Sequence, residues 1–120
     1  MNKKTDMGSL ETLNEEELNH LESLPIDQQK RLIRSGYVDF ASQHLILFRG
    51  DRKSFVVPLS NFKESGSGLQ ANFERLSFTD YGHTVKFGDY EADADWILYK
   101  FDSEYKKWAD LHISLYLKEI

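Results

Sequence analysis

The stretch that decides the fold runs from Tyr37 to Leu59 and reads YVDFASQHLILFRGDRKSFVVPL. It contains three short apolar runs, separated by polar segments: the runs are residues 37–40, 44–49 and 54–59, and the segments are 42–43 and 50–53. Runs of this length, rich in β-branched and aromatic residues and bounded by turn residues, are typical of strands. The spacing therefore predicts a meander of three antiparallel strands.

A further hairpin is expected after the Gly/Ser-rich loop at 65–68. We predict strands over 73–79 and 84–87, joined by a turn at 80–83 in which Gly82 can take a positive φ. Sequential strands with short connections favour one antiparallel sheet of about five strands.

Two short helices are predicted before the strands, over Thr12–Leu24 and Pro25–Ser35. Thr12 followed three residues later by Glu15 matches a capping box, in which each side chain accepts from the other residue's free backbone N–H. Proline at 25 ends one helix and can open the next, because its missing N–H is not needed in a first turn. Gly36 is then the expected stop signal.

Helical spacing of apolar residues returns from Asp93 to the end of the chain, with a break or kink expected at Asp102-Ser103. We expect the last helix to pack on the sheet. The predicted fold class is α+β: two N-terminal helices, an antiparallel sheet of about five strands and a C-terminal helix. Residues 1–10 are expected to be a disordered tail, and residues 11–120 a single α+β domain.

The composition narrows the function classes. The chain has 120 residues, no cysteine and a net charge of −5. The absence of cysteine rules out disulfides, thiolate zinc sites and cysteine nucleophiles. The acidic balance makes general binding to nucleic acid unfavourable, since that affinity comes mainly from neutralised phosphates. Residues 1–10 lack the apolar run of a signal peptide and no stretch is long enough for a membrane span, so we expect a cytoplasmic protein.

The sharpest local pattern is an acid at every second position: Asp89, Glu91, Asp93 and Asp95. A calcium loop of the EF-hand type would also need glycine at its sixth position and glutamate at its twelfth, and both registers lack them. We interpret the segment as a polar loop whose last acids cap the following helix. The alternatives are a weak metal site or an acidic surface for another protein. Our hypothesis of protein binding uses the second of these alternatives.

The basic residues Lys30, Arg31, Arg34 and Arg52 are the candidate DNA contacts, should the two leading helices and the following turn lie together. The simpler interpretation is that they compensate a helix dipole and solvate a hairpin turn. Aromatic residues of the last helix, above all Trp108 and Tyr116, are either core or a surface shared with a partner or a second copy. No catalytic residue, metal ligand set or cofactor motif is recognised.

The run Ser54–Phe62, SFVVPLSNF, and the later stretches Thr84–Phe87 and Tyr90–Asp95 resemble a bacterial family of small domains of uncharacterised function. The likeness spans about residues 38–98. Members of that family are often encoded beside a toxin-like partner or fused to a DNA-binding helical module. The resemblance implies an interaction or regulatory protein and carries no catalytic residues.

Three functions follow as hypotheses. The first is a small bacterial accessory protein, antitoxin-like or inhibitor-like, that binds another protein through Asp89, Glu91, Asp93, Asp95, Trp108 and Tyr116, and that could also form a homodimer. The second is a transcriptional regulator that contacts DNA through the basic residues. The third is a small enzyme or ligand-binding domain whose site is not visible in the sequence.

Overall fold

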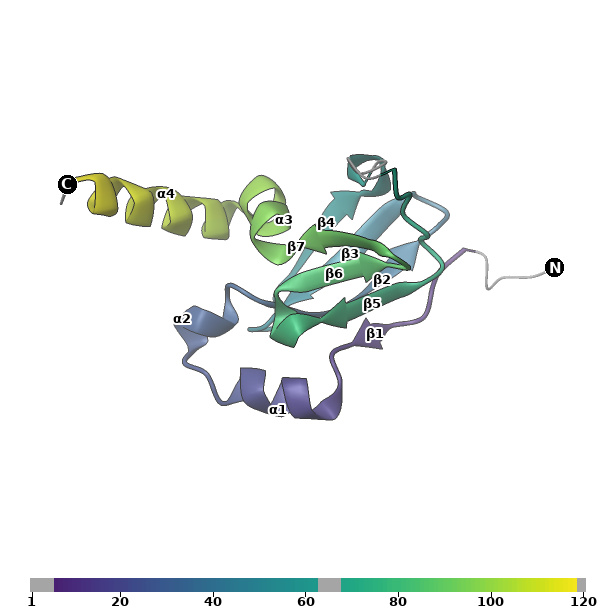
Figure 1. Ribbon diagram of the computed structural model, residues 1–120, viewed down its shortest axis with the longest axis horizontal. Helices are drawn as coiled ribbons and strands as arrows, with labels where there is room; N and C mark the ends of the chain where they lie inside the picture. The colour runs from purple at the N-terminus through teal and green to yellow at the C-terminus, as the bar shows by residue number, and fades with distance from the viewer. Residues whose placement is uncertain (1–5, 63–67, 119–120) are drawn as a thin grey trace.

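The computed structural model describes residues 6–62 and 68–118, with side chains as far as Ile113. Two antiparallel sheets face each other, and helices lie at their ends (Figure 1). The elements, in chain order, are β1 (Glu11–Thr12), α1 (Glu15–Glu22), α2 (Ile26–Gln29), β2 (Ile33–Asp39), β3 (His44–Arg49), β4 (Ser54–Pro58), η2 (Leu59–Asn61), β5 (Leu76–Thr79), η3 (Asp80–Gly82), β6 (Thr84–Phe87), β7 (Tyr90–Asp93), α3 (Ala94–Phe101) and α4 (Ser103–Lys118).

The predicted meander is confirmed as β2, β3 and β4 of the first sheet. The register of β2 on β3 runs from Ile33 opposite Arg49 to Asp39 opposite His44, with an irregularity after Ile33. β4 pairs with the other side of β3, and β1 lies on the other side of β2, so the strand order is β1-β2-β3-β4. Short polar turns between strands that carry matching apolar faces are sufficient to specify this part locally.

The prediction of one five-stranded sheet is wrong, because β5, β6 and β7 form a separate sheet. Its first hairpin is as expected, with Gly82 at φ 97° in the turn. The chain between Pro58 and Leu76 is too long for a hairpin turn, so β5 is free to pair away from β4. β7 was not predicted, since residues 90–93 were interpreted as a loop.

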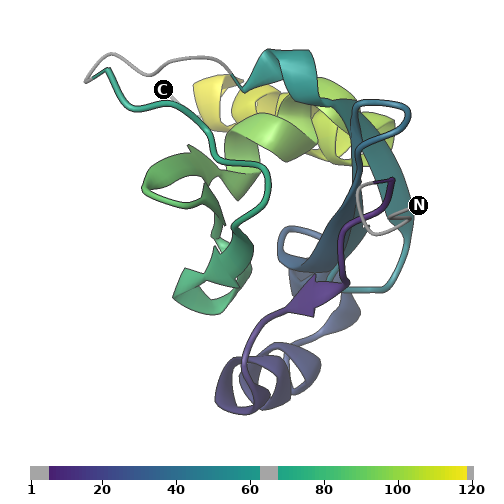
Figure 2. The ribbon, with the colours of Figure 1, turned by 90° about the vertical axis from the view of Figure 1, so that its right-hand side faces the viewer.

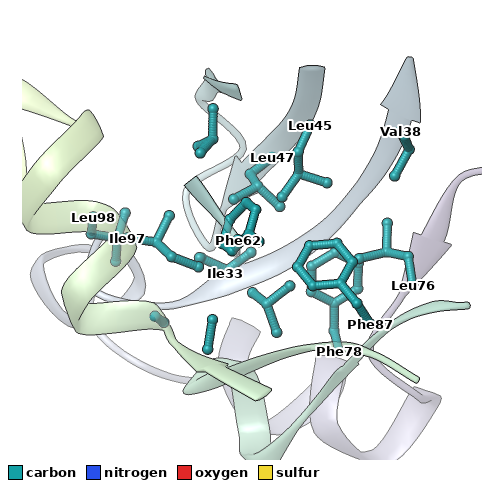
Figure 3. Packing of buried hydrophobic residues seen from close by; sticks show 14 of the residues in the cluster. Ile33, Val38, Leu45, Leu47, Phe62, Leu76, Phe78, Phe87, Ile97 and Leu98 are labelled. Atoms are coloured by element: carbon teal, nitrogen blue, oxygen red, sulfur yellow. The ribbon is translucent and has the colours of Figure 1, made fainter. Parts of the chain in front are cut away.

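The core lies between the inner faces of the two sheets (Figure 3). Leu45 and Leu47 of β3 point toward Phe78 and Phe87 of the second sheet, and Ile97 of α3 closes one end. The buried hydrophobic residues are Leu13, Leu21, Leu32, Ile33, Val38, Leu45, Leu47, Val57, Leu59, Phe62, Leu76, Phe78, Val85, Phe87, Ala92, Ala94, Ile97, Leu98 and Ala109. The outer face of the first sheet has no described helix on it (Figure 2).

The first helix begins later than predicted. Its N-cap is Asn14, whose Oδ1 accepts from the N–H of Glu17 at 2.8 Å, while Glu17 Oε1 accepts from the N–H of Asn14 at 3.3 Å. Thr12 lies instead in β1, opposite Ser35. The pairs Thr12/Glu15 and Asn14/Glu17 both have the spacing of a capping box. Because Thr12 pairs with β2 as part of β1, it cannot be the N-cap, and Asn14 takes that position.

The second helix ends far short of the predicted Ser35. α2 comprises Ile26–Gln29, and the chain enters β2 at Ile33. Gly36 is therefore a strand residue and no helix stop. A Cβ at Gly36 would lie 2.5 Å from the carbonyl oxygen of Ile46, so the close approach of β2 and β3 requires glycine there. Pairing with β3 outweighs the weak local preference for helix.

The break at the third helix is confirmed, because α3 ends at Phe101 and Asp102 has an extended conformation. The prediction that the last helix packs on the sheet holds for α3, which buries Ile97 and Leu98, and is wrong for α4. α4 extends away from the sheets (Figure 1), and Leu111 and Ile113 are 57% and 55% exposed. None of the helices in the described ranges combines the length and the apolar character that a bilayer crossing demands.

The tail predicted for residues 1–10 is described only from Asp6 on. There the N–H of Gly8 donates to the carbonyl of Val38 at 2.7 Å, and Met7 forms a bridge with Asp39. These residues run along the free side of β2, beyond the two residues of β1.

Candidate interaction surfaces

The acidic residues that the sequence singled out lie mainly on a strand, which corrects the predicted loop. Glu91 and Asp93 are exposed members of β7, while Ala92 between them is buried. Successive residues of a strand point to opposite faces of the sheet, so acids at every second position lie on one face. Here that face is the exposed face of β7, an edge strand of the second sheet. Asp89 is exposed just before it. Charges on an edge strand discourage pairing with another chain.

Two of these acids have a described contact with another element. Glu91 Oε2 lies 3.8 Å from Lys86 Nζ of β6. Asp95, in the first turn of α3, accepts a hydrogen bond from the Tyr105 hydroxyl at 3.0 Å. Burial and this carboxylate raise the pKa of Tyr105 to about 12. Asp93 is the N-cap of α3 but makes no capping bond with its side chain, so the predicted capping role is wrong for it. Among the described residues, no three His, Asp or Glu side chains gather as a metal site would require.

The candidate DNA contacts do not form one free basic patch. Lys30 is paired with Glu104 at 3.0 Å. Arg34 and Arg52 both contact Glu22, at 2.7 and 3.0 Å, and their hydrogen bonds hold the pKa of Glu22 below its ordinary value. Arg31 lies elsewhere, over the ring of Trp108. Arg34 and Arg52 share the carboxylate of Glu22, so the start of β2, where they meet, retains a net positive charge.

Arg49, a basic residue directly before a polar turn, has a side chain only 2% exposed. It is the last residue of β3 and points inward, in step with Leu45 and Leu47. Its guanidinium contacts Asp51, Asp102 at 2.8 Å and Glu104 at 3.0 Å. Asp102 and Glu104 stand on either side of the start of α4, so this cluster ties the break between the last two helices to the first sheet.

Electrostatics favour the charged forms of Arg49, Asp51 and Glu104. Burial alone would raise the pKa of Asp51, but the hydrogen bonds and charge of Arg49 outweigh it and hold that pKa below the ordinary value. Burial would likewise lower the pKa of Arg49, and the three carboxylates raise it instead. The pKa of Glu104 is lowered by Lys30 and Arg49. Fixing α4 in this way sets where its aromatic side chains lie.

Trp108 of α4 faces back toward α2 and is half-buried. The Arg31 guanidinium carbon lies 3.9 Å from the centre of the Trp108 ring. The centre of the His112 ring, on the same helix as Trp108, lies 4.2 Å from the centre of the Trp108 ring. These side chains line a pocket of about 270 Å³ between the two helices. Tyr116, the other aromatic residue predicted to bind a partner, lies outside the described side chains.

A surface that the sequence analysis missed is the outer face of the first sheet. We use this name for Tyr37, Ile46, Phe48 and Val56. Tyr37 opposes Ile46, and Ile46 opposes Val56, so the four side chains form one apolar patch. The rings of Tyr37 and Phe48 lie 6.5 Å apart, and Val56 is 52% exposed. The near-continuous apolar run of β3 was the available signal, because such strands are normally covered on both faces.

An open groove of about 790 Å³ lies at one side of this face. Its walls are the chain before β1, the start of β2, Phe48 and the turn after β3; the lining residues are Met7, Gly8, Leu10, Thr12, Arg34, Ser35, Tyr37, Phe48 and Arg52. Met7 and Leu10 are 53% and 63% exposed at its rim. The groove is thus mostly apolar, with two arginines at one end.

Comparisons with family models, curated proteins and solved structures found no match to this chain.

Proposed function

We propose that the protein is an accessory protein that acts by binding another protein, and that the outer face and its groove are the binding surface. The observation that carries the proposal is the apolar patch of the half-buried Tyr37, Ile46 and Phe48 and the exposed Val56, on which no described helix packs. The other face of the same sheet is largely buried in the core. Contiguous exposed apolar surface is costly in water, and its usual explanation is a partner that covers it.

The groove also indicates the chemistry of the partner. Exposed apolar side chains at its rim suit apolar anchors from a partner segment, and aromatic residues such as Tyr37 and Phe48 are common in the energetically important part of interfaces. Among the described residues Arg34 and Arg52 have one carboxylate partner between them, Glu22, which leaves a net positive charge. A partner segment with apolar side chains followed by a carboxylate therefore matches both features.

The acidic strand and the exposed side of α4 remain the alternative surfaces for the same function. The outer face is favoured because its apolar residues come from three paired strands and are rigidly placed. Three of the four candidate DNA contacts are already paired with carboxylates, so the geometry supports protein binding over the DNA-binding hypothesis. The bacterial and antitoxin-like context stays an expectation from the resemblance alone.

The test compares two variants that exchange an exposed aliphatic residue for lysine. Val56→Lys places a charge in the outer face, and Leu111→Lys makes the same change on α4, where the exposed fraction is similar at 57% against 52%. Each tagged protein is used to capture partners from its host, and the affinity of the purified partner is then measured by calorimetry. We expect Val56→Lys to weaken binding by about tenfold or more, and Leu111→Lys to leave it unchanged.

Loss of binding in Leu111→Lys alone would refute the outer face as the binding surface and assign the function to α4. Equal recovery of the same proteins by all three baits would refute specific binding through either surface. Sedimentation of the wild-type protein over a range of concentrations tests the homodimer. A dimer that Val56→Lys dissociates would identify a second copy as the partner.

A further inference from the structure

The pocket between α2 and α4 holds an arginine without an acidic partner. Arg31 is half-buried, and its Nε is fully buried with no hydrogen-bond acceptor among the described residues. No ion pair or hydrogen bond of the described chain involves its terminal nitrogens either. The other cation of this pocket, Lys30, is paired with Glu104. Arg31 is thus the cation of this pocket for which no ion pair is described, and among the carboxylates of the lining Asp27 likewise has none.

The terminal nitrogens of Arg31, unlike its buried Nε, stay accessible, so their N–H groups are usable. Trp108 covers one face of the guanidinium, with 3.9 Å between the guanidinium carbon and the ring centre. A guanidinium stacked on an aromatic ring keeps its N–H groups in its own plane, where they can form a two-pronged pair with a planar oxyanion. The stack therefore holds the arginine in place without occupying its hydrogen-bonding edge.

The charges around the pocket select the kind of anion. Its lining includes the cations Lys30 and Arg31 and the carboxylates Asp27 and Glu104. Their formal charges cancel, so a single negative charge is easier to accommodate than the double charge of a phosphate. A carboxylate is the monoanion whose planar shape matches the guanidinium.

The remaining walls indicate what the carboxylate is attached to. Tyr105, Trp108 and His112 form an aromatic strip along α4, with ring centres 5.6 Å and 4.2 Å apart for the two neighbouring pairs. His112 Nδ1 is engaged, 2.8 Å from the carbonyl of Trp108, which fixes the ring against the strip. A volume of about 270 Å³ suits a small molecule. We propose that this pocket binds a small monocarboxylate with a flat apolar or aromatic body, anchored by Arg31.

The experiment uses Trp108 as its own reporter. The chain has two tryptophans, so Trp96→Phe in the full-length chain leaves Trp108 as the only one. Its fluorescence is followed during additions of sodium benzoate, acetate, phosphate and chloride at constant ionic strength. We expect saturation at millimolar concentrations with benzoate, weaker binding of acetate, still weaker binding of phosphate and no response to chloride.

Arg31→Lys keeps the charge and removes the planar fork, so we expect it to weaken benzoate binding by about tenfold or more. Arg75→Lys makes the same exchange at an exposed site that lines neither this pocket nor the groove, and should leave the affinity unchanged. NMR spectra of the protein with intact Arg31 provide the second measurement, in which benzoate should shift the Arg31 Nε–H and Trp108 Nε1–H signals. The proposal is overturned by a response that does not saturate, by unchanged affinity in Arg31→Lys, by shifts confined to other residues, or by phosphate binding more tightly than acetate.

Discussion

Arg49→Met keeps most of the length and the apolar stem of the side chain but removes the guanidinium that joins β3 to the start of α4. The side chain is 2% exposed, and its partners Asp51 and Asp102 are 7% and 13% exposed. The substitution therefore leaves two poorly solvated carboxylates without their common cation. We expect a large loss of stability and a loosened attachment of α4.

The magnitude follows from the burial of the partners. Removing one member of a buried ion pair typically costs about 3–5 kcal/mol, because the other charge stays buried and unpaired. Asp102 and Glu104 can turn toward water, so we expect the lower end, about 3 kcal/mol. With a urea m-value of about 1.5–2 kcal/mol/M, the midpoint of unfolding should fall by about 1.5–2 M.

The assay is urea unfolding followed by tryptophan fluorescence and by circular dichroism, at several pH values. The pKa of Asp51 is lowered in the folded wild type, so its contribution is complete above the ordinary value of 3.8 and is lost as the pH falls through the lower folded value. In Arg49→Met the arginine no longer lowers the pKa of Asp51, and burial, which raises this pKa, is opposed only by backbone N–H groups such as that of Lys53. The stability difference between the two proteins should therefore narrow as the pH falls below about 4.

Arg52→Met is the matched control, because Arg52 is 73% exposed in its pair with Glu22. Exposed pairs contribute about 0–1 kcal/mol, so this variant should unfold near the wild-type midpoint. A loss below about 1 kcal/mol in Arg49→Met, or a difference between wild type and variant that does not change with pH, would refute the role given to the Arg49 cluster.

Three further outcomes are expected. Asn14→Ala removes the capping oxygen of α1 and should cost about 1 kcal/mol in chemical unfolding, while Asn14→Ser should recover most of it. Gly36→Ala places a Cβ 2.5 Å from the carbonyl oxygen of Ile46 and should lower the thermal midpoint by several degrees, about 1–3 kcal/mol; an unchanged midpoint would contradict the close strand approach. Tyr105→Phe should remove, from an alkaline absorbance titration, a tyrosine that ionises at about pH 12. Because burial and Asp95 raise this pKa, the wild type should also lose stability relative to the variant as the pH rises from 10 to about 12.

Parts of the candidate site could be predicted from the sequence and parts could not. The acids at 89–95 were recognised, but the same spacing fits a loop and a strand, and only pairing of β7 with β6 decides between them. Trp108 was named as a partner contact, which stays a prediction; its neighbour within the fold, Arg31, comes from a segment far away in the chain and could not be foreseen. Arg49 shows the same limit: a basic residue before a turn looks exposed until α4 brings carboxylates to it.

By itself the sequence determined the elements whose causes are local: the strands within 37–59, the hairpin at 76–87 and the break at Asp102. Turn residues and apolar alternation act over a few residues, so they can be read without knowing the rest of the chain. The tertiary structure alone decided the early end of α2, the second sheet, the burial of Arg49 and the uncovered outer face. Each of these depends on which distant segments pack together, and long-range pairing and burial outweigh the small differences in local preference.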